Sequence, residues 1–361
     1  MSSLREKWTN IWTSIRQTPA KIPARVTIRP SQVDRGASMG GAFEPKAHYF
    51  QVRVNEMFLT AGREWLTRYD PMVFVVSEFT YDKKVETVPF IVGPSMMEKF
   101  GQKIPQGMIF SNTRVAGLHP YQGGRLTLSI VLCRVKRQDY ARGLLQMLES
   151  VASVIDFSTA LTTYVKVAGV VLDGVETLFG LGDTEPLIGV RTEFDPDAGD
   201  PLRPSYFALI DKPESEIEPS RLWVRDNKLL YGESLAEAIP FREADYVLYS
   251  LVHTSKRTDE AILPFYPLYE QVLQAATNPD EGSWKRAKAN MLTLYQALVL
   301  SPDLTPKQAD ALYNHYLTKM KQMRARVVDL GSLGTPDEAA PPTISPEDEA
   351  KLNEAVSILD L

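Results

Sequence analysis

The spacing of apolar residues changes several times along the chain. In residues 4–17 apolar side chains recur every three or four positions, at Leu4, Trp8, Ile11, Trp12 and Ile15. This spacing predicts an amphipathic helix that packs on the body of the protein. Residues 18–46 are rich in Pro and Gly and are expected to form a loop, interrupted at most by a short strand near residues 25–29.

From His48 onward the period becomes two, which predicts strands. The expected strands are 48–54, 71–82, 85–93, 107–117 and 125–137, with a hairpin at Tyr81–Lys84. A second strand-rich stretch covers 188–194, 205–211, 221–226, 228–232 and 245–253, with a hairpin turn at Asp226–Asn227. Strands that follow one another without intervening helices favour antiparallel sheets, arranged as a sandwich.

Between the two strand-rich stretches lies the longest apolar segment, Leu144 to Leu181. Five charged residues interrupt it, which disfavours a constitutive membrane span; these are Glu149, Asp156, Lys166, Asp173 and Glu176. Their spacing, together with that of nearby Ser and Thr residues, places the polar side chains on one narrow stripe. We therefore expect a long, buried, central helix over residues 140–181, in which Gly169 and Gly174 allow close packing or mark a kink that splits the segment in two.

Two other environments for this helix remain open. Like helices of two subunits would meet at an oligomer interface, or the helix would be a shielded membrane-active element that a conformational change releases. The preferred interpretation is a central helix sandwiched between the strand-rich regions and the C-terminal helices, because membrane insertion would have to neutralise the carboxylates.

The last hundred residues predict helices and then a flexible tail. Residues 259–329 contain three helical segments, and residues 330–349 have the composition of a linker. The acidic end carries Leu352, Val356 and Leu359 on one helical face, a candidate partner-binding motif. The expected fold class is α+β, with antiparallel β-sandwich-like layers around a long central apolar helix, a C-terminal helical subdomain and a flexible tail. The expected segments are residues 1–46, 47–258 (interrupted by helix 140–181), 259–329 and 330–361.

Composition narrows the class of protein. The 361 residues carry a net charge of −5, with 44% hydrophobic and 24% charged residues, values ordinary for a globular protein. A negative net charge disfavours a broad nucleic-acid surface. A single cysteine, Cys133, excludes an intramolecular disulfide, and residues 1–17 lack the apolar core of a signal peptide. These features predict a cytoplasmic location.

Candidate catalytic and metal sites are weak. Ser234 stands in a Gly-Glu-Ser-Leu-Ala sequence, but Ser234 and Glu237 fit a helix capping box better than a nucleophile elbow. Cys133 lies within an apolar strand, where a thiol is usually inert. The four histidines are widely spaced, without a zinc motif. The best metal candidate is the oxygen-rich loop of Asp195, Asp197 and Asp200, which suits Ca²⁺ but lacks a completing Glu. No cofactor is expected.

The sequence therefore predicts a non-enzymatic protein-interaction or regulatory protein that docks unidentified protein partners through surface loops and the C-terminal tail. The alternative from another class is a latent membrane-active effector whose helix 144–181 is released by proteolysis or by displacement of the C-terminal region. A structural subunit of an assembly, a homo-oligomer and a hydrolase using Ser234 or Cys133 are lesser alternatives.

Overall fold

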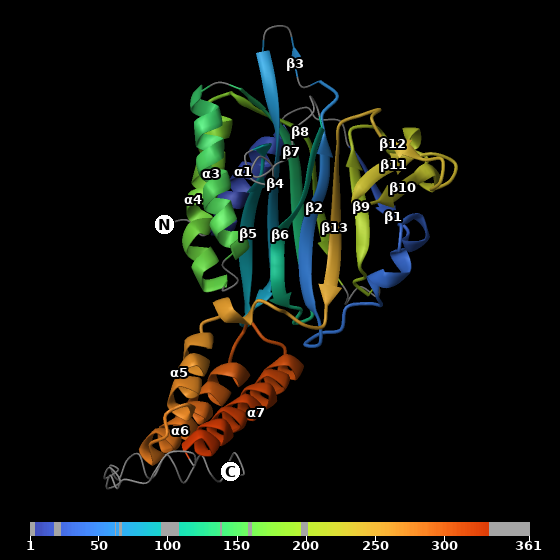
Figure 1. The fold of residues 1–361 in the computed structure, drawn as a ribbon. Helices are drawn as coiled ribbons and strands as arrows, with labels where there is room; N and C mark the ends of the chain where they lie inside the picture. The colour runs from blue at the N-terminus through green and yellow to red at the C-terminus, as the bar shows by residue number, and fades with distance from the viewer. Residues whose placement is uncertain are drawn as a thin grey trace. The chain divides into compact units, whose positions relative to one another are not determined.

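The computed structural model describes residues 4–17, 23–61, 63–64, 67–94, 108–137, 139–157, 161–195 and 201–331 (Figure 1). The chain divides into two compact units, Met1–Ser255 and Lys256–Leu361. The first unit combines helices with antiparallel sheets, and the described part of the second is helical. The predicted α+β class with antiparallel sheets is confirmed.

The first unit has three α-helices and thirteen strands in its described residues. The helices are α1 (Leu4–Gln17), α3 (Asp139–Phe157) and α4 (Leu161–Gly180). The strands are β1 (Ala24–Ile28), β2 (Tyr49–Phe58), β3 (Arg63–Glu64), β4 (Thr67–Tyr81), β5 (Lys84–Val92), β6 (Met108–Pro120), β7 (Leu126–Lys136), β8 (Thr184–Phe194), β9 (Ser205–Ile210), β10 (Leu222–Arg225), β11 (Lys228–Tyr231), β12 (Ile239–Pro240) and β13 (Tyr246–Thr254).

Two five-stranded antiparallel sheets form the centre of this unit. In sheet 1 the order is β1-β9-β13-β2-β6, and in sheet 2 it is β3-β4-β7-β8 with β5 paired to β4. Sheet 1 joins strands that lie almost two hundred residues apart in sequence, because β13 pairs with both β2 and β9. The predicted hairpin at Tyr81–Lys84 is confirmed, since these two residues close the β4–β5 ladder.

One hydrophobic cluster lies between the two sheets. Alternate residues of β2, such as Val52 and Val54, and of β4, such as Val73 and Val75, belong to it and are fully buried. Period-two patterning places one set of side chains of each strand on this inner face. The sheets therefore face each other across a common core.

The apolar segment that we expected to be one central helix forms two helices, α3 and α4. They pack against each other and cover the outer face of sheet 2 together with α1 (Figure 1). A Cβ atom added at Gly174 would overlap the side chain of Leu148, so this glycine allows the close approach of the two helices. The expectation of a single central helix over 140–181 is therefore wrong, and the segment divides between Phe157 and Leu161 rather than at Gly169 or Gly174. Two shorter helices need only one apolar face each, and one sheet surface suffices to bury both.

The polar residues of the segment, expected on one stripe, are distributed over the two helices. Glu149 on α3 is 1% exposed, and a Cβ added at Gly93 would lie 2.8 Å from its Oε1. Asp173 on α4 is exposed and pairs with Lys7 of α1 at 2.5 Å. The side chains of Asp156 and Lys166 lie outside the described residues. Positions that share a stripe on one continuous helix thus have different environments on two helices.

A small sheet covers part of the outer face of sheet 1. Strands β10, β11 and β12 form it, and the predicted hairpin at Asp226–Asn227 is confirmed by the pairing of Arg225 with Lys228. Its apolar side chains pack against alternate residues of β1, β9 and β13 in one cluster. We call this the small sheet.

The second unit contains α5 (Tyr266–Ala276), α6 (Glu281–Val299) and α7 (Pro306–Gly331), which share one apolar cluster. The three helical segments expected in this region are confirmed. Thr305 accepts a hydrogen bond from the Gln308 amide, as a helix N-cap does. The Gln308 side chain bonds both the amide and the carbonyl of Arg257, and so ties the entry of the unit to α7.

Of the helices in the described parts of the chain, none combines the length and the apolar character that a membrane crossing requires.

Candidate functional site

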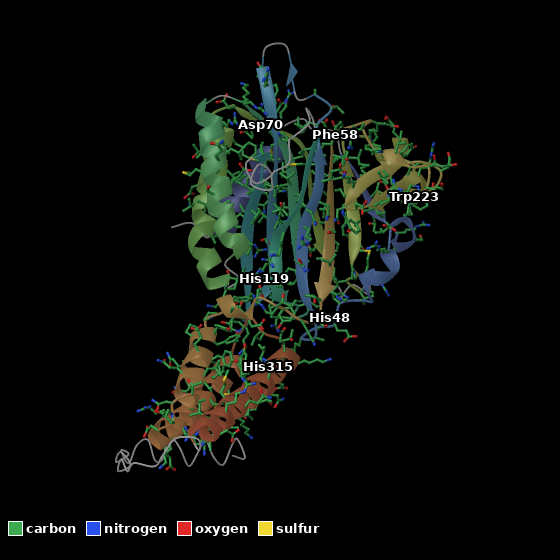
Figure 2. All side chains as sticks on the ribbon, viewed as in Figure 1. His48, Phe58, Asp70, His119, Trp223 and His315 are labelled. Atoms are coloured by element: carbon green, nitrogen blue, oxygen red, sulfur yellow. The ribbon has the colours of Figure 1, made fainter. Side chains whose placement is uncertain are left out.

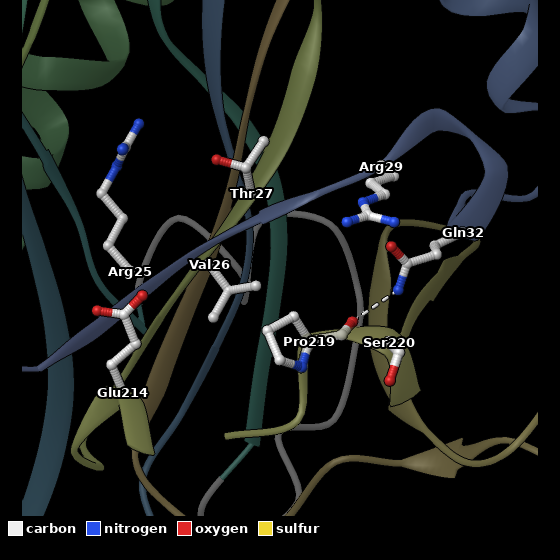
Figure 3. A pocket seen from close by; sticks show the side chains of 8 residues that line it. All are labelled: Arg25, Val26, Thr27, Arg29, Gln32, Glu214, Pro219 and Ser220. Atoms are coloured by element: carbon white, nitrogen blue, oxygen red, sulfur yellow. Dashed lines mark hydrogen bonds between the residues drawn. The ribbon is translucent and has the colours of Figure 1, made fainter. Parts of the chain in front are cut away.

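A pocket of about 210 Å³ lies along the edge strand β1 (Figure 3). Residues 25–27 of β1 and Arg29 line one side, Gln32 another, and Glu214, Pro219 and Ser220 the opposite wall. Val26 points toward Pro219, whereas Arg25 and Thr27 point to the other face of the strand. Because side chains from both faces of β1 line the pocket, it wraps around the edge of the strand.

That edge is open within the described residues. Ala24 donates its amide to Lys212 O on the β9 side, at 2.8 Å. Successive residues of a strand direct their backbone groups to opposite sides, so Arg25 and Thr27 direct their N–H and C=O groups away from β9. No described residue bonds to these four groups. The pocket therefore presents hydrogen-bonding backbone as well as side chains.

The walls of the pocket are held by specific contacts. The Gln32 amide nitrogen donates to Pro219 O and to Leu222 O, both at 2.7 Å. Arg25 donates to the Tyr249 hydroxyl at 3.1 Å, and its guanidinium lies 4.6 Å from the centroid of the Phe207 ring. The Gln32 bonds hold the loop before the small sheet, and the Arg25 contacts hold that side chain on sheet 1, so the lining is ordered in the absence of a ligand.

Glu56, on β2, is a buried carboxylate near the small sheet. It is fully buried and accepts the Leu229 amide at 2.8 Å, with Arg242 at 3.5 Å and the Tyr246 hydroxyl beside it. Burial raises the pKa of Glu56 above its ordinary value, and these partners oppose the rise. Burial raises the pKa of Tyr246 as well, and the negative charge of Glu56 raises it further. Because its Oε2 accepts the amide of Leu229 on β11, Glu56 attaches the small sheet to sheet 1.

A group with a raised folded-state pKa binds its proton more tightly when folded than when unfolded. The first unit should therefore gain stability from Glu56 as the pH falls from 7 toward the ordinary carboxyl value of 4.5. In Glu56→Gln this contribution is absent. We expect the free energy of unfolding of the natural protein to rise relative to that of the variant over this interval, measured by denaturant titration. Glu237→Gln, at an exposed position, should leave the difference constant; a constant difference for Glu56→Gln would contradict the assignment.

An asparagine cluster lies beside Glu56 and anchors the same hairpin. The Asn55 amide donates to Asn112 Oδ1 at 3.2 Å and to Asn227 Oδ1 at 3.3 Å, and the Tyr206 hydroxyl donates to Asn227 at 2.8 Å. Asn112 and Asn227 have positive φ values of 37° and 61°. The Asn55 Oδ1 is buried and has no partner among the described residues. A bridging water suits such an acceptor, and the cluster as a whole locks the turn in place.

The structure describes only some of the residues that the sequence singled out as metal-binding or partner-binding candidates. Asp197, Asp200 and the tail residues Leu352, Val356 and Leu359 lie outside the described residues, so both motifs stay predictions. Asp195 pairs with Arg125 at 3.2 Å. The described residues contain no group of three or more His, Cys, Asp or Glu side chains placed to hold a metal ion.

The two candidate nucleophiles have environments that disfavour reaction. Cys133 is fully buried against the helices, and burial raises the pKa of its thiol, which reduces the thiolate that would react. Ser234 lies in a turn, where its carbonyl accepts the amides of Glu237 and Ala238. The helix expected after Ser234 is therefore wrong, since β12 follows the turn instead.

The histidines are less scattered than their spacing suggested. His48 and His119 lie at the same end of the sheets (Figure 2), and His253 stacks on His48. The His48 and His253 rings are nearly parallel, 4.1 Å apart with an interplanar angle of 4°. Nitrogen lone pairs lie in the ring plane, so two parallel rings do not direct them at one metal ion.

Neither the site on β1 nor the histidine pair was found from the sequence. The pocket joins residues 25–32 to residues 214–220, and no local motif records that juxtaposition. The only sequence signal was the short strand expected near residues 25–29. The chain matches no protein-family model, and no curated protein matches it.

Proposed function

We propose that this protein is a non-enzymatic binding protein that holds an extended segment of a partner protein along the open edge of β1. The observation that carries the proposal is the open backbone edge of Arg25 and Thr27 inside a preformed pocket. An extended peptide adds to such an edge as a further strand, with backbone hydrogen bonds for affinity and side-chain pockets for specificity.

The size of the pocket favours a peptide side chain over a small-molecule cofactor. Sites for drug-sized ligands usually occupy about 300–1,000 Å³, more than the 210 Å³ around β1. The five residues of β1 match the length of a short added strand. Natural sheets usually protect a free edge with charge, proline or a covering loop, so an accessible edge with a pocket is a favourable place for a partner.

Charge suggests which residues the partner segment carries. Arg29 is exposed and has no carboxylate partner among the described residues. Arg25 adds a second positive charge, and Glu214 is the acidic residue of the lining. An acidic side chain of the segment therefore suits Arg29, while Val26 and Pro219 offer an apolar wall. Residues 29–32 and 213–221 are loops and short turns, in keeping with the expectation that surface loops dock the partner.

We expect Thr27→Pro to weaken peptide binding and leave the fold intact. Proline removes the amide that faces the open edge, and edge strands tolerate proline where its nitrogen faces solvent. The probe is a set of linear ten-residue peptides selected from a random display library on the full chain. Affinities of the selected peptides, measured by isothermal titration, should fall at least about tenfold in Thr27→Pro, as the loss of a backbone hydrogen bond and of strand registry implies.

Thr27→Val is the matched control, because valine keeps the amide and favours a strand. It should bind the selected peptides as the natural protein does. Arg29→Glu should weaken the binding of peptides that carry an acidic residue and leave the binding of other peptides unchanged. Failure to enrich any peptide, or equal affinity for the natural protein and Thr27→Pro, would refute the proposal.

A further inference from the structure

Residues 40–48 close one end of the first unit through two histidines. Nε2 of His253, on β13, lies 2.9 Å from Gly41 O, and the Glu44 amide donates to Nδ1 of His48 at 3.0 Å. The two imidazole rings stack at 4.1 Å. Gly40 has a φ of +86°, and a Cβ atom there would lie 3.0 Å from the His253 ring. The segment is thus held closely on the His253 side chain.

The hydrogen bonds define where the protons lie. A carbonyl oxygen only accepts, so Nε2 of His253 carries a proton, and Nδ1 is the atom that gains one in acid. A backbone amide only donates, so Nδ1 of His48 is unprotonated. A proton added to His253 leaves its bond to Gly41 intact. A proton added at Nδ1 of His48 faces the Glu44 amide and removes that bond.

We propose that His48 and His253 form a pH-sensitive clasp that releases residues 40–48 when both imidazoles are protonated. One proton is compatible with the stack, on His253. The second proton, on His48, creates two positively charged rings 4.1 Å apart that repel each other. It also breaks the hydrogen bond from the Glu44 amide to His48. Histidine is the side chain whose ordinary pKa lies between pH 5 and 8, and this interval is therefore the one in which opening of the clasp is tested.

Other titratable groups lie near the pair in the described residues. Glu44 and Lys46, both exposed, flank it on the segment itself. Tyr121, at the end of β6, packs on Phe43, which contacts the His253 ring edge-on at 4.9 Å. His119 lies on the other side of Phe50 and is buried. Glu44 is the one acidic group among them, and its exposed position leaves it screened by solvent.

Release would uncover an apolar end of the core. Phe43 is 6% exposed and belongs to the cluster between the sheets. The backbone bonds that hold the segment run from Phe43 N to Leu202 O at 2.8 Å and from Lys46 N to Tyr121 O at 2.6 Å. These amides, with that of Glu44, report opening directly. Asp34, whose amide donates to Val224 O at 2.8 Å, is tied to the small sheet and serves as an internal reference.

The test is amide hydrogen exchange by NMR on the full chain between pH 7.5 and 5, corrected for intrinsic exchange, with the histidine ring nitrogens titrated in the same samples. Protection of Phe43, Glu44 and Lys46 should fall at least about tenfold, the effect of one lost hydrogen bond together with charge repulsion. The fall should follow the second of the two histidine protons, while Asp34 keeps its protection.

His48→Gln keeps an acceptor for the Glu44 amide and has no charge at any of these pH values, so the segment should stay protected at pH 5. His315→Gln, on α7, is the matched control and should behave as the natural protein does. Constant protection of the three amides in the natural protein, or a loss that precedes the second histidine proton, would overturn the clasp. These measurements need no peptide, so they are independent of the binding site on β1.

Discussion

Replacing Arg257 by alanine is expected to unfold the helical unit at much lower denaturant than in the natural protein. The Arg257 side chain is fully buried and forms a bidentate pair with Asp259, with distances of 2.7 and 3.2 Å. Its third bond goes to Asp303 O at 2.9 Å, in the turn before α7. Breaking a buried ion pair by removing one partner costs about 3–5 kcal/mol, because the remaining groups lose their compensation.

The size of this effect follows from where the arginine acts. The backbone of Arg257 is bound by Gln308, so side chain and main chain together fasten the start of the unit to the turn that begins α7. Lysine cannot replace the planar fork that reaches Asp259 and Asp303 at once, and Arg257→Lys should therefore lose most of the same stability.

Hydrogen exchange resolved by mass spectrometry gives the measurement. Peptides from α5, α6 and α7 should exchange faster together in Arg257→Ala, while those from sheets 1 and 2 keep their protection. Arg326→Ala, at an exposed position on α7, is the control and should change stability by less than about 0.5 kcal/mol. Unchanged exchange in α5 to α7 for Arg257→Ala would contradict the role given to this side chain.

The second large effect is expected at Trp8, whose replacement by alanine should detach α1 from sheet 2. Trp8 is fully buried, with its ring 5.4 Å from Phe74 in an edge-on contact. Deleting a buried Trp side chain costs about 3–5 kcal/mol. Ile11 and Ile15 are also buried in the same apolar cluster, and Leu4 and Trp12 pack against it. A helix of 14 residues is marginal without tertiary packing, so undocking should also unfold it.

A matched pair of variants separates packing from hydrogen bonding at this position. The indole nitrogen of Trp8 is buried and has no partner among the described residues. Trp8→Phe removes that polar group and keeps most of the ring, so it should cost much less than Trp8→Ala. Thermal unfolding and proteolysis between α1 and β1 measure the stability of both variants. Equal losses of stability in Trp8→Phe and Trp8→Ala would refute this account. Thr13→Ala, at an exposed position, is the control and should leave the stability unchanged.

Local pattern was sufficient for most of the strands and the C-terminal helices. The Asp226–Asn227 turn and the pairing of Tyr81 with Lys84 follow from residues adjacent in sequence, because hairpin geometry depends on the turn and its flanking strands. The helical stripe of α1 likewise predicted the face that packs on the protein, with Trp8, Ile11 and Ile15 buried and Leu4 and Trp12 half-buried. These elements need no knowledge of distant partners.

The long apolar segment shows where local pattern stops being sufficient. Hydrophobicity reports that a side chain will be buried, not which surface buries it. The same residues suit one enclosed helix or two helices on a sheet, and the close contact between Gly174 and Leu148 belongs only to the second arrangement. Glu149 and Asp173 have different environments for that reason.

The sequence by itself determined the α+β composition, the antiparallel strands, the hairpin turns and the amphipathic first helix, because all of these depend on periodicity and turn chemistry over a few residues. Only the tertiary structure decided the open edge of β1 beside residues 214–220, the attachment of Glu56 to Leu229, and the stacking of His48 on His253. Each of these joins residues more than one hundred and fifty positions apart. Contacts of that kind depend on the order of the strands in the sheets, and the residues adjacent in sequence do not determine that order.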